Sequence, residues 1–98
     1  MLVKIIKSYR IIVTVCDSNL IGKKLGQDKF QLDLKENFFK GEEKSKQEAI
    51  EIMQRMSDED ATFNIVGQES IDTALEAGII NQQGIKIIQD VPFALVLL

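Results

Sequence analysis

Apolar and polar residues alternate in two segments at the start of the chain. Residues 2–7 alternate imperfectly, and residues 11–16 carry apolar or β-branched side chains on both faces. A period of two with β-branched residues predicts strands. The three-residue connection predicts that these strands form an antiparallel hairpin. Apolar residues on both faces of the second strand indicate a position inside the sheet.

The centre of the chain, residues 62–80, combines a strand pattern with a helix pattern. Its first residues place Phe63 and Ile65 on one face, and Gly67 then allows a turn without a Cβ penalty. Four apolar residues follow at helical spacing: Ile71, Ala74, Leu75 and Ala77. Gly78 occupies the position where many helices end in a left-handed residue. We expect a strand, a turn and a short helix that together form the packing centre of the fold.

A second helix is predicted by the sequence Ser-Lys-Gln-Glu at residues 45–48, because a serine three positions before a glutamate forms a capping box. The apolar residues after it recur at helical spacing and give the helix one buried face: Ala49, Ile52, Met53 and Met56. The helix is expected to run for about three turns and to end near Ser57.

Two strands are predicted at the end of the chain, residues 85–88 and 93–98, and the turn between them is expected at residues 90–92. We expect the two strands to pair as a second hairpin. The last strand is nearly all apolar. It is therefore expected either buried on both faces in the middle of the sheet or at an edge that pairs with another chain.

Residues 30–34, between the first hairpin and the capping box, alternate and predict one more strand. Residues 20–25 and 35–44 are expected to form loops. The second loop contains the adjacent Phe38 and Phe39. We expect both rings to fold over the core, and stacking on nucleobases is the alternative.

These elements predict one domain over residues 1–98, because a chain of this length buries a single core. The fold class is α+β, with a mostly antiparallel or mixed sheet of about five to six strands and two helices. The longest apolar run is only a few residues, and the chain opens on a strand pattern rather than a targeting sequence. We therefore expect a cytoplasmic protein with no membrane partner.

Composition narrows the chemistry that this chain can perform. It has no histidine and a single cysteine, Cys16. The absence of histidine excludes histidine-activated nucleophiles and histidine metal sites, and a single cysteine excludes an internal disulfide. Cys16 lies at a strand end and is expected to be a small buried hydrophobe. We therefore expect no enzyme activity, no metal and no cofactor.

The net charge is −3, but the charges are divided unevenly along the chain. Residues 1–49 carry ten basic residues against seven acids, and residues 50–98 carry two against eight. Such a chain can present a basic face to a phosphate backbone despite its net charge. The candidate phosphate contacts are Arg10, Lys23, Lys24 and Lys29. A second candidate is the corner from Asn64 to Gly67, where free N–H groups at the next helix start would bind an anion.

Four stretches of the chain form a distinctive combination: VCDSNLIGKKL at residues 15–25, LDLKENFFKGE at 32–42, NIVGQESIDTALEAGII at 64–80 and VPFALVLL at 91–98. Together they resemble a small archaeal family of unknown function whose members are often labelled RNA-binding. The resemblance covers nearly the whole chain in order and length. It implies an α+β domain with a place in RNA or translation biology. Members usually carry a histidine after the proline of the last stretch, where this chain has Phe93.

The positions that match the family define a candidate shared surface: Asp17, Gly22, Lys23, Asn64 and Gly67. The leading hypothesis is a non-enzymatic RNA-binding or translation-associated domain that acts near the ribosome. The alternative is a protein-interaction or homo-oligomerisation module. That module would form a homodimer through its last strand, or dock a basic partner on the acidic second half of the chain.

Overall fold

The computed structural model describes residues 1–97, so Leu98, the last residue of the predicted final strand, lies outside the described residues. The elements in chain order are β1 (Leu2–Lys7), β2 (Ile11–Cys16), β3 (Lys24–Gln27), β4 (Phe30–Asp33), α1 (Glu36–Phe39), β5 (Glu42–Glu43), α2 (Lys46–Asp58), β6 (Thr62–Val66), α3 (Gln68–Ala77), β7 (Lys86–Ile88) and β8 (Val91–Val96). Short 3₁₀ helices lie at Ser18–Leu20 and Gln82–Gly84. No helix within residues 1–97 is long and apolar enough to cross a membrane.

The main sheet has six strands in the order β5-β1-β2-β6-β8-β7, and β3 pairs with β4 in a separate two-stranded sheet. Neighbours β2 and β6 are parallel, with Cys16 opposite Val66, whereas the other pairs are antiparallel. The sheet is therefore mixed, and the predicted α+β class is confirmed. The predicted interior position of β2 and the hairpin that it forms with β1 are also confirmed.

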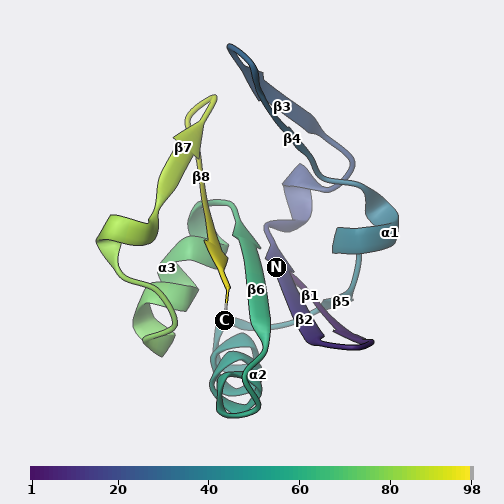
Figure 1. The fold of residues 1–98 in the computed structure, drawn as a ribbon, viewed down its shortest axis with the longest axis vertical. Coiled ribbons are helices and arrows are strands. Elements are labelled where there is room, and N and C mark those ends of the chain that lie inside the picture. Colours follow the sequence, from purple (N-terminus) through teal and green to yellow (C-terminus); the bar gives the residue numbers. More distant parts are fainter. Residues whose placement is uncertain (98) are drawn as a thin grey trace.

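The molecule has three layers, with the main sheet in the middle (Figure 1). Helices α2 and α3 cover one face, and α1 with the β3–β4 hairpin covers part of the other. Because side chains alternate along a strand, Val15 and Ile65 pack against the two long helices, whereas Cys16 and Val66 face the opposite layer. The sheet thus separates two apolar cores, each built from residues distant in sequence.

Both predicted helices are confirmed, and the predicted capping box at the start of α2 and glycine stop at the end of α3 are present. Ser45 Oγ accepts a hydrogen bond from the Glu48 N–H at 3.2 Å, and Glu48 Oε1 accepts one from the Ser45 N–H at 3.0 Å. Helix α3 ends at Gly78, whose φ is 78°. The Ile79 N–H then donates to the carbonyl oxygen of Ala74 at 3.0 Å, which completes the expected termination motif.

The prediction of loops at residues 20–25 and 35–44 is wrong in part, because these segments contain β3, α1 and β5. In β3 only Leu25 is buried, so the strand shows no alternation that a sequence pattern would reveal. Helix α1 is a single turn whose Phe39 is buried and whose Phe38 is half-buried in the second core. The expectation that both rings fold over the core is confirmed.

The second hairpin is confirmed, but its turn lies earlier than predicted. The turn residues are Gln89 and Asp90, with φ of 48° and 64°, while Val91 and Pro92 already belong to β8. β8 lies between β6 and β7, which confirms the expected interior position, but Leu95 is 53% exposed, so the expectation that the strand is buried on both faces is wrong. β7 pairs only with the first three residues of β8, so within residues 1–97 no strand pairs with Ala94–Val96 on that side.

Candidate functional site

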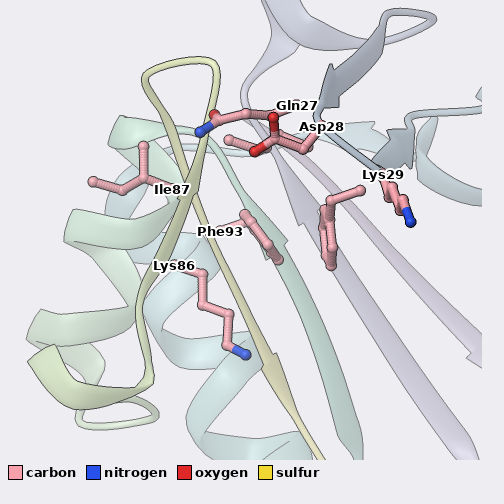
Figure 2. A pocket seen from close by; sticks show the side chains of 8 residues that line it. Gln27, Asp28, Lys29, Lys86, Ile87 and Phe93 are labelled. Carbon is pink, nitrogen blue, oxygen red and sulfur yellow. The ribbon is translucent and has the colours of Figure 1, made fainter.

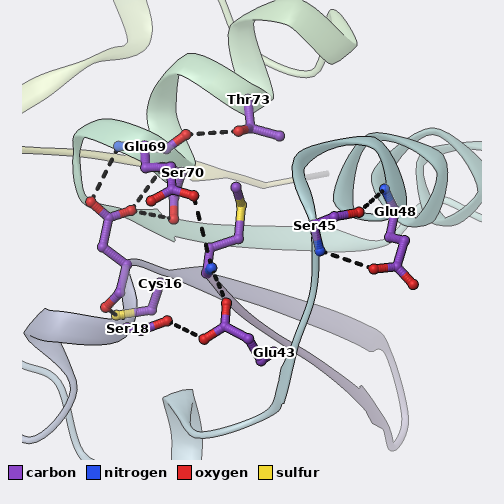
Figure 3. A network of polar contacts seen from close by, with 10 residues as sticks. Cys16, Ser18, Glu43, Ser45, Glu48, Glu69, Ser70 and Thr73 are labelled. Carbon is purple, nitrogen blue, oxygen red and sulfur yellow. Dashed lines mark hydrogen bonds and ion pairs between the residues drawn. The ribbon is translucent and has the colours of Figure 1, made fainter.

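Asp17 lies where the parallel strands β2 and β6 end, beside the start of α3. One carboxylate oxygen accepts hydrogen bonds from the Ser70 N–H at 2.8 Å and from Ser70 Oγ at 2.7 Å. The other accepts from the Glu69 N–H at 3.2 Å, and Figure 3 shows these bonds around Glu69 and Ser70. The Asp17 N–H donates to the carbonyl oxygen of Val66 at 3.0 Å. Asp17 therefore caps a helix that begins fifty residues later in the sequence.

Gly67 makes room for this carboxylate. A Cβ on Gly67 would lie 2.2 Å from Asp17 Cγ, and the backbone φ of 108° is one that other residues rarely adopt. The prediction of free N–H groups at this corner is wrong for Glu69 and Ser70, because Asp17 already accepts their hydrogen bonds. The corner is an internal junction rather than an open anion site.

Two other members of the predicted shared surface take no part in this junction. The Gly22 N–H donates to the carbonyl oxygen of Leu34 at 2.7 Å, near the base of the β3–β4 hairpin. Asn64 is half-buried in the middle of β6, opposite Thr14 and Leu95 in the register. Of these positions, the structure brings Asp17 and Gly67 into contact.

Near the junction, the environment favours the charged form of the Glu43 carboxyl and the neutral form of the Cys16 thiol. The pKa of the Glu43 carboxyl is lowered, first by its hydrogen bond with the amino group of Met1 and then by that from Ser18 Oγ at 2.5 Å. Burial raises the pKa of the Cys16 thiol to about 12, and the charge of Asp17 adds to this rise. Cys16 is fully buried, so it is a protonated core residue at neutral pH.

The predicted phosphate contacts are spread over the molecule. Lys23 and Lys24 lie where the chain enters β3, Lys29 lies in the β3–β4 turn, and Arg10 lies in the β1–β2 turn. Figure 1 places the β3–β4 turn at the top of the view and the β1–β2 turn near the bottom. Arg10 lines a hollow with two acidic residues, whereas Lys29 lines a cleft against β7 and β8. Arg10 and Lys29 therefore do not belong to one site.

A different set of basic residues converges on a hollow beside β1, which we call the basic hollow. Its volume is about 530 Å³. The basic side chains that line it are Lys4, Lys40, Lys44 and Arg55. One acid, Glu42, lies among them and forms an ion pair with Lys44 at 3.2 Å. Four basic residues and one acid give the lining a formal charge of +3, in a chain whose net charge is −3.

The cations come from different parts of the chain: Lys4 from β1, Lys40 and Lys44 from the segments before and after β5, and Arg55 from α2. The segment with Lys40 lies close against β1, because a Cβ on Gly41 would come within 2.1 Å of the Val3 carbonyl oxygen. Lys4 Nζ donates to the Asn37 carbonyl oxygen at 2.6 Å. Within residues 1–97, neither Lys40 nor Arg55 forms an ion pair. The hollow thus holds cations that an anion can still neutralise.

The basic hollow was missed by the sequence reasoning. Its lysines were counted in the basic first half, but no local motif joins Lys4 to Lys40, which are distant along the chain. Arg55 belongs to the acidic second half of the sequence and lines the hollow from α2. The uneven division of charge along the sequence was the one signal for a basic surface, and it does not indicate which lysines lie close together in the fold.

The chain belongs to a family described as a protein of unknown function (DUF424), whose model matches residues 6–98. This confirms the resemblance to a family of unknown function. The fold is similar to the crystal structure of an uncharacterized conserved protein from Methanopyrus kandleri, with a TM-score of 0.84 and 20% sequence identity. That match covers 97% of this chain and 88% of the other, and at this identity it shows the fold alone. No curated protein matches the chain.

Replacing Gly67 by alanine is expected to lower the free energy of unfolding by more than about 3 kcal/mol, because backbone strain of about 1–3 kcal/mol adds to a collision with Asp17. Gly78→Ala is the matched control: its φ is 78°, but no atom lies within 4 Å of the new Cβ. The control is expected to cost about 1–2 kcal/mol. Urea unfolding followed by circular dichroism measures both losses. Equal losses would contradict the close contact at Gly67.

Cys16 is expected to resist alkylation in the folded protein at neutral pH, because its raised pKa leaves little thiolate and burial blocks access. Mass spectrometry after iodoacetamide treatment measures the modification, with the same reaction in urea as the control. Modification of the native protein as fast as of the unfolded chain would contradict this assignment and reopen a nucleophilic role for Cys16.

Proposed function

We propose that this protein is a non-enzymatic RNA-binding domain, and that the basic hollow binds the phosphate backbone. The observation that carries the proposal is that Lys4, Lys40, Lys44 and Arg55, from distant parts of the sequence, all line one hollow. A positive hollow in an acidic chain has a local potential opposite to that of the rest of the molecule. RNA phosphates are the polyanion suggested by the resemblance to a family whose members are often labelled RNA-binding, and translation is the setting that this resemblance implies.

The chemistry of the hollow suits a phosphodiester chain. Lysine ammonium groups contact phosphates as point charges, and the arginine guanidinium can bind two phosphate oxygens at once. Apolar side chains from Val3, Ile5 and Ile52 also line the hollow. They lower the local exposure to water and so strengthen charge interactions at its mouth. Each phosphate contact releases a counterion from RNA, so affinity for RNA is expected to fall as salt rises.

Removing two of these cations tests the proposal. Lys40→Ala/Lys44→Ala is expected to weaken binding of single-stranded RNA at least about tenfold, because a hydrogen bond to a charged group contributes about 1.5–3 kcal/mol. Fluorescence anisotropy with a labelled oligonucleotide measures the affinity across a salt series. The slope of log K against log salt is expected to become shallower by about 1.4, or about 0.7 for each lost contact.

Lys23→Ala/Lys24→Ala removes the same charge from the base of the β3–β4 hairpin and is the matched control. It is expected to change RNA affinity much less than the variant in the basic hollow. If the wild-type affinity does not depend on salt, the RNA proposal fails. If the Lys23/Lys24 variant loses more affinity than the Lys40/Lys44 variant, the phosphate contacts lie at the hairpin instead of the hollow.

A second candidate function is self-association through the last strand. Beyond Phe93, the outer side of β8 has no strand partner within residues 1–97. Leu95 and Leu97 on this segment are 53% and 68% exposed. The outer edge of β8 beyond Phe93, with its exposed leucines, is suited to pairing with the same edge of another copy.

If this candidate is correct, light scattering after size exclusion will give the mass of a dimer, and Leu95→Lys will restore the monomer by placing a charge in the interface. Ile87→Lys, which changes another exposed apolar residue on β7, is the control and should leave the dimer intact. A wild-type monomer at every concentration would contradict self-association and leave the RNA proposal untouched.

A further inference from the structure

The cleft that Lys29 lines lies between the β3–β4 turn and the β7–β8 hairpin (Figure 2). Its volume is about 500 Å³, within the range of sites for small molecules. Phe30, Ile87 and Phe93 supply apolar surface, and Lys29 and Lys86 supply ammonium groups. In Figure 2, Phe93 lies between Lys86 on β7 and Lys29 on the β3–β4 turn. The cleft thus joins an aromatic surface to two cations.

The two walls of this cleft are tied together by glutamine side chains. The Gly26 N–H donates to Gln89 Oε1 at 2.9 Å, and the Gln89 N–H donates to Gln27 Oε1 at 3.0 Å. The rings of Phe30 and Phe93 add a contact, with centroids 5.7 Å apart and an angle of 32° between their planes. Because these contacts already hold the two walls together, the free-energy cost of ordering the site when a ligand binds is smaller.

The lining favours a flat ligand that carries an anion. Phe30 is 53% exposed although its ring contacts Phe93. A planar ligand over Phe30 would remove apolar surface from water and add an aromatic contact. Lys29 and Lys86 favour a negative group on the same ligand, and Asp28 can accept a hydrogen bond from an amino group. A nucleobase with its phosphate combines these properties.

We propose that this cleft binds a nucleotide, with the base stacked on Phe30 and the phosphate held by Lys29 and Lys86. The inference rests on the proposed function in one respect, because the nucleotide is taken to be an unpaired unit of bound RNA. A paired base keeps its faces covered by its neighbours, so it cannot stack on a side chain. The cleft therefore selects single-stranded RNA, whereas the basic hollow contacts backbone phosphates of any strand.

Titration of the ¹⁵N-labelled protein with AMP tests the cleft without RNA. Amide signals of Phe30, Lys86 and Phe93 are expected to shift with AMP and to shift less with ribose 5-phosphate, which lacks the base. Phe30→Ala is expected to weaken AMP binding at least about fivefold, the lower end of what one stacked base contributes. Tyr9→Ala, which removes an exposed aromatic ring in the β1–β2 turn outside the cleft, is the matched control and should stay within about twofold of the wild type.

Labelled single-stranded and duplex RNA then separate this inference from the proposed function. If Phe30→Ala weakens binding of the single strand more than of the duplex, the bound nucleotide is a unit of RNA. If AMP binds in the cleft but neither RNA binds, the proposed function fails and the cleft is a site for free nucleotides. If AMP leaves Phe30 and Phe93 unshifted, if ribose 5-phosphate reproduces the shifts, or if Phe30→Ala binds AMP normally, the inference is overturned.

Discussion

The carboxylate of Asp17 at the start of α3 is the contact on which the arrangement of the molecule depends. Strands β2 and β6 are parallel and end side by side, and the chain leaves each of them toward a different layer. Asp17 joins the two exits through its bonds to Glu69 and Ser70. A negative side chain also suits the positive end of a helix. Asp17, which follows β2, thereby fixes the start of α3, which follows β6.

With this junction occupied by a side chain of the protein itself, the surfaces suited to a ligand lie at the two sides of the main sheet. The basic hollow lies beside β1, and the cleft lined by Phe30 and Phe93 lies beside β7, near the other end of the strand order. The two surfaces differ in chemistry, because basic residues dominate the polar lining of the hollow, whereas the cleft has two lysines beside the exposed ring of Phe30.

The sequence alone predicts elements whose signals are local. The capping box at Ser45, the glycine stop at Gly78 and the alternation in β1 and β2 each lie within a few residues, so a pattern can reveal them. β3 and the one-turn α1 are stabilised by tertiary contacts and give no such pattern. Asp17 and Gly67 were selected through the family resemblance, but their contact across fifty residues has no sequence signal. The same limit applies to the basic hollow, because net charge counts lysines without placing them.

The central claim is that Asp17 and Gly67 act as one unit, and a double-mutant cycle tests it most directly. The free energy of unfolding is measured by urea for the wild type, Asp17→Ala, Gly67→Ala and the double variant. Removing the Asp17 carboxylate removes the group that a Cβ at position 67 would strike. Gly67→Ala is therefore predicted to cost at least about 1 kcal/mol less in the Asp17→Ala background than in the wild type. If Gly67→Ala alone is unfolded, a folded double variant gives the same answer. If the loss of unfolding free energy in the double variant equals the sum of the two single losses within about 0.5 kcal/mol, the claim is contradicted.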